Sequence, residues 1–121
     1  MNLNSILIGS EDPQRLSDYY TQLFDKPGWE GGDFKGWQLG SGWLTVGPHD
    51  QVKGQNEAPG RIIWNMETAD VAGEFERLKA AGATVVMPPY HPGEDPEGQI
   101  ATFSDPDGNY FQIMSPMEPP S

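Results

Sequence analysis

The sequence contains no cysteine, which excludes disulfides, thiolate catalysis and Cys-ligated metal sites. Basic residues are scarce, because 7 Lys and Arg stand against 18 Asp and Glu and give a formal net charge of -11. This charge disfavours nucleic acid and anionic membranes and is compatible with a cationic partner. No apolar run approaches the roughly 18 residues of a membrane span, and the N-terminus lacks a basic stretch followed by an apolar one. We therefore expect a soluble cytoplasmic protein.

Hydrophobic and aromatic residues are nevertheless plentiful, at 36% and 11% of the 121 residues. This composition predicts one folded domain with a modest core rather than a disordered chain. The 15 Gly and 12 Pro are scattered between short apolar runs, which is typical of turns in a strand-rich protein.

The first half of the chain predicts a strand, a helix and three further strands. An apolar run over residues 3–9 has the length of a strand, and Asp12 followed by Pro13 is typical of a helix start. The apolar residues of this helix recur on one face and are Leu16, Tyr19, Tyr20, Leu23 and Phe24. Strands are then predicted around Trp29 and over residues 34–39 and 43–46, between Gly-rich turns.

The second half repeats this pattern. A strand over residues 61–66 precedes a helix over 68–81, whose apolar face carries Val71, Phe75 and Leu78. Three strands follow, predicted over residues 84–87, 100–103 and 109–114. The chain thus divides into a first module of about 1–50, a linker of about 51–60, a second module of about 61–116 and a tail of 117–121. The loop of residues 88–98 is rich in Pro, Gly and acid, and we expect its Glu94, Asp95 and Glu97 to be solvated.

Residues 105–108 read Asp-Pro-Asp-Gly and join the last two predicted strands. Asp105, Asp107 and Asn109 have the spacing that opens a calcium loop. However, Tyr110 occupies the sixth position, where such a loop needs Gly. The motif is therefore predicted to be a turn.

Two βαβββ units in a chain of this length, with residues 105–111 opening the last strand, resemble the vicinal oxygen chelate (VOC) superfamily. This superfamily includes glyoxalases, extradiol dioxygenases and bleomycin-resistance proteins. The segments 16–24 and 75–83 also resemble its first and second helices. The resemblance implies an α+β fold, in which a mixed sheet is cupped around a cleft, and commonly a homodimer.

In enzymes of that superfamily, four cleft-facing positions hold a divalent metal through His, Glu or Gln. The resemblance places Ser5, Thr45, Arg61 and Gln112 at these positions. A hydroxyl and an amide without imidazole or carboxylate are poor ligands, and a guanidinium repels a cation. We therefore predict that the metal site is absent and that no cofactor is bound.

Strand alternation predicts which side chains face the cleft. They are Ser5, Leu7, Trp43, Thr45, Arg61, Ile63, Tyr110 and Gln112. Such a surface suits a planar or partly apolar small molecule. Arg61 either anchors an anionic group or pairs with an internal acid, and Trp43 and Tyr110 either bind ligand or pack in an interface or core.

The remaining tryptophans and the histidines are assigned other places. Trp37 and Trp64 are predicted to lie in the core. His49 and His91 are predicted to be exposed in loops, with His91 reaching the cleft as an acid or base as the alternative. Neither belongs to a spaced cluster of metal ligands.

Three functions are compatible with these features. The favoured hypothesis is a metal-free binding protein that sequesters a ligand in the manner of bleomycin-resistance proteins. The second is a lyase, isomerase or dioxygenase-related enzyme with a displaced or absent metal, using Glu67, His91 or Tyr110. The third is a regulatory or interaction module with a vestigial cleft. The acidic balance favours a cationic ligand, whereas Arg61 favours an anionic group.

Overall fold

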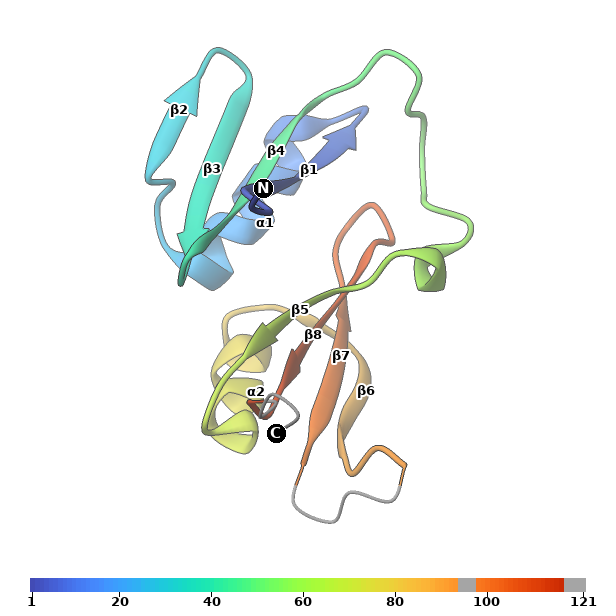
Figure 1. Ribbon diagram of the computed structural model, residues 1–121. Helices are drawn as coiled ribbons and strands as arrows, with labels where there is room; N and C mark the ends of the chain where they lie inside the picture. The colour runs from blue at the N-terminus through green and yellow to red at the C-terminus, as the bar shows by residue number, and fades with distance from the viewer. Residues whose placement is uncertain (94–97, 117–121) are drawn as a thin grey trace.

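The computed structural model describes residues 1–93 and 98–116 and consists of two βαβββ units, one above the other in Figure 1. The first unit comprises β1 (Ser5–Ser10), α1 (Pro13–Phe24), β2 (Trp29–Gly31), β3 (Phe34–Leu39) and β4 (Gly42–Pro48). The second comprises β5 (Trp64–Glu67), α2 (Val71–Ala80), β6 (Thr84–Tyr90), β7 (Ile100–Ser104) and β8 (Tyr110–Met114). The α+β class and the repeated unit expected from the sequence are confirmed.

Each unit forms its own four-stranded mixed sheet. The strand orders are β1-β4-β3-β2 and β5-β8-β7-β6, so that the first and last strands of each unit pair in parallel. Ile6 lies opposite Leu44 in the first sheet, and Trp64 lies opposite Phe111 in the second. These pairs are equivalent positions of the repeat.

Both helices begin at an aspartate cap. The Asp12 carboxylate accepts a hydrogen bond from the Arg15 backbone N–H at 3.1 Å, as the sequence predicted. Asp70 caps α2 through the Gly73 N–H at 2.9 Å. Each cap contributes about 1 kcal/mol. The second helix therefore begins at Val71 rather than at 68, because the carboxylate closes its first turn there.

The core is continuous between the two units. The Tyr20 ring of α1 lies 6.1 Å from the ring centres of both Trp37 and Trp64, and 5.9 Å from that of Phe111. Trp37 comes from the first sheet, whereas Trp64 and Phe111 come from the second. The predicted core positions of Trp37 and Trp64 are confirmed. One helix thus packs against side chains from both sheets, which fixes the junction where pockets form.

Residues 105–108 form a turn, as predicted, and this clasp turn joins the second unit to the first. The Tyr20 hydroxyl donates to the Asp105 carboxylate at 2.7 Å. Ser10 and Arg15 both donate to the Asp107 carboxylate, Arg15 at 2.8 Å. Both aspartates are buried. Their oxygens serve protein donors, so the turn has a structural role.

Three predicted boundaries are wrong. β5 begins at Trp64 instead of 61, because the Arg61 N–H bonds to the Ala58 carbonyl and closes a 3-10 turn, η1 (Pro59–Arg61). Strand β6 extends through Pro88 and Pro89 to Tyr90, which were predicted to lie in a loop. β6 is an edge strand with register shifts, where proline is tolerated. Third, α2 starts late, as described above. Glu94, Asp95 and Glu97 lie outside the described residues.

Neither helix found in residues 1–93 and 98–116 has the length and apolar character to cross a membrane.

Candidate functional site

The outer surface of the first sheet, which faces away from α1, carries three large rings. Trp29, Gly36, Thr45 and Leu7 form one row across the strands, because their backbones pair in that order. Trp29 is 50% exposed and Phe34 is 36% exposed, and Trp43 is partly buried beside them. We call the surface made by Trp29, Phe34 and Trp43 the aromatic face.

Glycines form the floor beneath these rings. A Cβ added at Gly36 would lie 3.3 Å from the Trp43 ring and 3.6 Å from that of Trp29. A Cβ added at Gly47 would overlap the Phe34 ring. The rings therefore lie close to the backbone because no side chain stands under them. This arrangement leaves their upper surfaces open to a planar molecule.

The corresponding surface of the second sheet is polar. Asn65, Gln112 and Thr102 lie in one row across β5, β8 and β7. The Gln112 amide N–H donates to the Thr102 hydroxyl at 2.9 Å, which orients the Gln112 side chain. The two units therefore differ in chemistry, since one presents rings and the other presents the amides of Asn65 and Gln112 beside the buried Thr102.

The strand register corrects one of the four positions at which the superfamily holds its metal. Because Ile6 and Trp64 are equivalent, the partner of Ser5 in the repeat is Ile63, two residues after Arg61. Ile63 offers no donor atom, and the Thr45 hydroxyl donates to the Ile6 carbonyl at 3.0 Å. Among the residues described, no three His, Cys, Asp or Glu gather as ligands. These positions do not fit the metal.

Two pockets flank the contact between the units. The first pocket encloses about 600 Å³ between the starts of β1 and β4, the β3–β4 turn and strand β5. The second encloses about 410 Å³ between the end of β1, the linker, Ile62 and the clasp turn. Ile6 and Trp64 line both pockets, so these equivalent residues form the wall between them.

Trp64 has a feature that sequence reasoning missed. Its indole N–H is the one buried side-chain polar atom that lacks a hydrogen-bond partner in the described part of the chain. The residue is 9% exposed, and leaving such a donor unpaired costs about 1–3 kcal/mol. No local sequence signal reveals this, because the missing acceptor is a property of the packed junction.

The predicted site residues do not converge on one pocket. Ser5 and Trp43 line the first pocket, and Leu7 and Tyr110 line the second. Neither pocket is lined by Thr45, Gln112, Ile63 or Arg61. Arg61 is exposed in η1 rather than in a strand. Its predicted place at a metal position is therefore wrong, and its role as an anion anchor stays a prediction.

The groups considered for catalysis are also separate. Glu67 lines the first pocket, whereas Tyr110 lines the second. His91 is exposed, and its Nδ1 is 2.7 Å from the Gly98 carbonyl oxygen in the β6–β7 loop. His49 is exposed as well and accepts a hydrogen bond from the Gln51 backbone N–H at 3.2 Å. The loop positions predicted for both histidines are confirmed.

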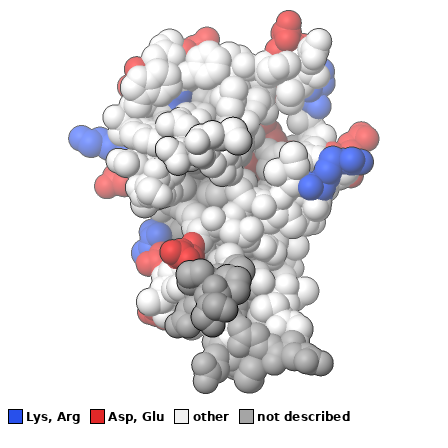
Figure 2. Space-filling model, in the orientation of Figure 1, with Lys and Arg blue, Asp and Glu red and all other residues white. Residues whose placement is uncertain are grey.

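Charge is unevenly spread over the molecule. On the face seen in Figure 2, charged side chains lie mostly around the rim, and uncharged side chains cover most of the centre. Inside the fold, burial raises the pKa of Asp105 above its ordinary 3.8, although hydrogen bonds from Tyr20 and Asn109 lower it. Burial also raises the pKa of Tyr19 to about 12. Asp105 belongs to the clasp turn and accepts a structural hydrogen bond from Tyr20, and Tyr19 donates to the Ser104 carbonyl next to that turn.

The family can be assigned by comparison. The sequence model of a glyoxalase-like domain matches residues 5–114, which is nearly the whole chain. The chain belongs to this glyoxalase-like family. It is thus a member of the VOC superfamily, which confirms the resemblance seen in the sequence. No curated protein sequence matches this glyoxalase-like chain.

Solved structures share the fold of this glyoxalase-like protein. A glyoxalase-related enzyme from Fulvimarina pelagi is 21% identical, with a TM-score of 0.74 over 96% of this chain and 88% of the other. A glyoxalase/bleomycin resistance protein/dioxygenase family enzyme from Burkholderia phytofirmans PsJN is 20% identical, with a TM-score of 0.73 over 97% and 100%. TioX from Micromonospora sp. ML1 is 18% identical, with a TM-score of 0.71 over 97% and 100%. At these identities the likeness shows the fold alone.

Proposed function

We propose that this glyoxalase-like protein binds a planar, partly apolar small molecule on its aromatic face and sequesters it without the superfamily's metal ion. The observation that carries the proposal is the set of rings over a glycine floor, in which Trp29 and Phe34 are exposed and Trp43 is partly buried. Stacked aromatic contacts each contribute about 0.5–1.5 kcal/mol beyond the area they bury. Three such rings on one sheet supply a binding platform that needs no metal.

Charge favours a cationic ligand. The net charge of -11 attracts cations to the molecule as a whole. The rings themselves also attract a cation through their π faces. Arg61 does not oppose this, since it lies in η1, outside the strands that carry the rings.

A homodimer completes the site in this proposal. The aromatic face of one chain is open, and the same chain offers the amides of Asn65 and Gln112, here called the amide row, from its other sheet. A partner chain that lays its amide row opposite the aromatic face would enclose a ligand between rings and hydrogen-bonding groups. Such a pocket combines apolar burial with sparse polar anchors.

The proposal predicts charge-selective binding of planar probes. We expect 9-aminoacridine, a planar cation, to quench tryptophan fluorescence and to bind about tenfold more tightly at low salt than 9-anthracenecarboxylate, a planar anion of similar size. Substituting Trp29→Leu or Trp43→Leu should weaken binding of the cation about three- to tenfold, because one stacked ring is lost.

The matched control is Val86→Ala, which removes an exposed apolar side chain from the second unit and should leave the affinity unchanged. Circular dichroism checks that each variant is folded. Equal affinity of wild-type protein and both tryptophan variants for 9-aminoacridine would contradict the proposal.

A further inference from the structure

We propose that the first pocket is a second small-molecule site, which shares Trp43 with the aromatic face but is lined by neither Trp29 nor Phe34. It takes a neutral or cationic molecule with an apolar body and one acceptor oxygen, such as a carbonyl, which pairs with the Trp64 indole N–H. The unpaired donor, the shape of the junction and the charge of the lining all support this assignment.

The donor is held in place before any ligand arrives. The Trp64 ring stacks on Phe111 with ring centres 5.1 Å apart and an angle of 20° between the planes. Phe24 and Tyr20 pack against the same ring at 6.4 and 6.1 Å. An indole fixed on several sides loses little conformational entropy when it binds, so its N–H is preorganised for an acceptor.

The pocket exists because the two units are not equivalent at their hairpins. In the second unit, the clasp turn between β7 and β8 reaches the first unit and bonds to Ser10, Arg15 and Tyr20. The equivalent turn in the first unit is the short Gly40-Ser41 connection between β3 and β4, which lines the first pocket. The second pocket is further narrowed by the linker, since Asn56 donates to the Asp107 carbonyl at 2.8 Å. The first pocket is therefore the larger.

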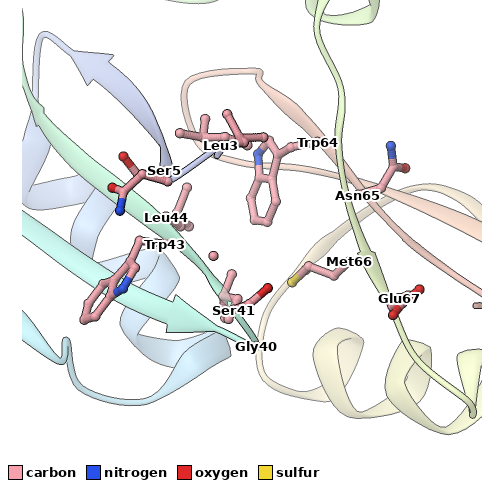
Figure 3. A pocket seen from close by; sticks show the side chains of 14 residues that line it. Leu3, Ser5, Gly40, Ser41, Trp43, Leu44, Trp64, Asn65, Met66 and Glu67 are labelled. Atoms are coloured by element: carbon pink, nitrogen blue, oxygen red, sulfur yellow. The ribbon is translucent and has the colours of Figure 1, made fainter. Parts of the chain in front are cut away.

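The lining defines the class of ligand. Figure 3 shows Trp64 and Met66 projecting from β5 toward the side of the pocket where Leu44 lies. Ile6 adds to this apolar surface, while Glu67 is the one ionisable residue in the lining and no basic residue accompanies it. An anion would meet Glu67 without a compensating charge, so neutral and cationic molecules are selected.

Leu3 lines the same pocket as the donor. It is largely exposed, it precedes β1, and in Figure 3 it lies on the side of Trp64 that carries the indole nitrogen. Residues 1–4 belong to no strand or helix. A small displacement of Leu3 therefore makes room for a ligand beside the N–H at little cost to the rest of the fold.

The test uses matched probes and the indole resonances of the four tryptophans in a 1H–15N spectrum, with Trp64 assigned by Trp64→Phe. We expect N,N-dimethylbenzamide to shift the Trp64 indole resonance downfield in a saturable way. Isopropylbenzene, which lacks the acceptor, should bind about three- to tenfold more weakly, as expected for one net hydrogen bond. Benzoate should not bind. The resonance of Trp29, which does not line the first pocket, reports separately on the aromatic face.

Three variants separate a binding site from a structural feature. Ser41→Trp fills the pocket mouth from an exposed turn and should abolish the shift, whereas Ser41→Ala, its matched control, should preserve it. Leu3→Ala should strengthen amide binding, because it leaves more room beside the donor. Neither position lies in the core, and triple-resonance assignment of wild type identifies the Trp64 resonance if Trp64→Phe fails to fold.

Equal binding of the amide and the hydrocarbon would overturn the proposal. The proposal would also be overturned if no probe moved the Trp64 indole resonance of the folded protein. This includes the case in which a long-lived water is found to accept the hydrogen bond from the indole N–H. If these tests of the first pocket fail while 9-aminoacridine still binds, the proposed function of the aromatic face is unaffected.

Discussion

Asp105 is a buried acid, and the four hydrogen-bond donors to its carboxylate come from both units of the fold. Its carboxylate accepts from the Tyr20 hydroxyl, the Asp107 N–H, and both the backbone and side chain of Asn109. Desolvation raises its pKa above 3.8, and these hydrogen bonds act against that rise. Because the folded state holds this proton more tightly than the unfolded chain, the resulting stability is full below about pH 3.8 and is lost as pH rises through the folded pKa.

The first prediction compares wild type with Asp105→Asn, which cannot titrate at this position. The free energy of unfolding of wild type, relative to the variant, should fall as pH rises above 3.8 and level off beyond the folded pKa, because only wild type loses the contribution of the bound proton. Urea unfolding at several pH values measures this difference.

Tyr20→Phe provides the check on the cause. Removing the hydroxyl donor takes away a hydrogen bond that lowers the Asp105 pKa, so the stability of this variant should continue to fall to a higher pH than that of wild type. A difference between wild type and Asp105→Asn that is constant with pH would show that Asp105 does not titrate as its burial implies.

Strand β4 illustrates how one element serves two surfaces. Leu44 and Val46 are buried against the core, while Trp43, Thr45 and Gly47 face the other way. This is the alternation that a strand imposes. The small residue at 47 is what allows the Phe34 ring to lie against the sheet.

The element-scale prediction uses two glycines of β4. Gly47→Ala should displace the Phe34 ring, lower the free energy of unfolding by about 1 kcal/mol and weaken 9-aminoacridine binding, because the new Cβ overlaps that ring. Gly42→Ala, the control, meets no atom within 4 Å and should retain or slightly raise stability. Aromatic NMR shifts of Phe34 and thermal unfolding measure both effects. Equal behaviour of the two variants would show that the ring is not seated on Gly47.

At the scale of the whole molecule, the outer surface of the first sheet exposes large apolar side chains. Leu7 is 56% exposed on β1, in the same row as Trp29, which is 50% exposed. Isolated apolar residues are normal on a protein surface, but a gathered set marks an interaction surface. The superfamily resemblance and this exposure both favour a second copy as the partner.

The corresponding prediction is that sedimentation equilibrium at micromolar concentration gives twice the chain mass of 13.3 kDa. Leu7→Glu should shift the protein toward monomer by placing a charge on the outer sheet surface. Ala72→Glu, on the exposed side of α2, should leave the dimer intact. A monomer at every concentration, or dissociation by both variants alike, would contradict a dimer formed through the sheet surface.

Much of the fold follows from patterns within a few residues of each other. The apolar face of α1, the Asp12 cap and the turn at residues 105–108 are local features, so the sequence determined them correctly. The same alternation of side chains predicted which residues of β1 and β4 face the core. Arg61 was misplaced because the apolar strand pattern begins three residues before the true start of β5, and only the 3-10 turn keeps Arg61 out of the strand.

The sequence by itself determined the class of fold, the repeated unit and the poor metal-binding chemistry of Ser5, Thr45 and Gln112, because each depends on residue type and short spacing. Tertiary structure alone decided that the predicted site residues divide between two pockets and that the Trp64 N–H lacks an acceptor. These properties arise where strands far apart in the chain meet. Packing at such a junction depends on the register and orientation of both units at once, which no local pattern encodes.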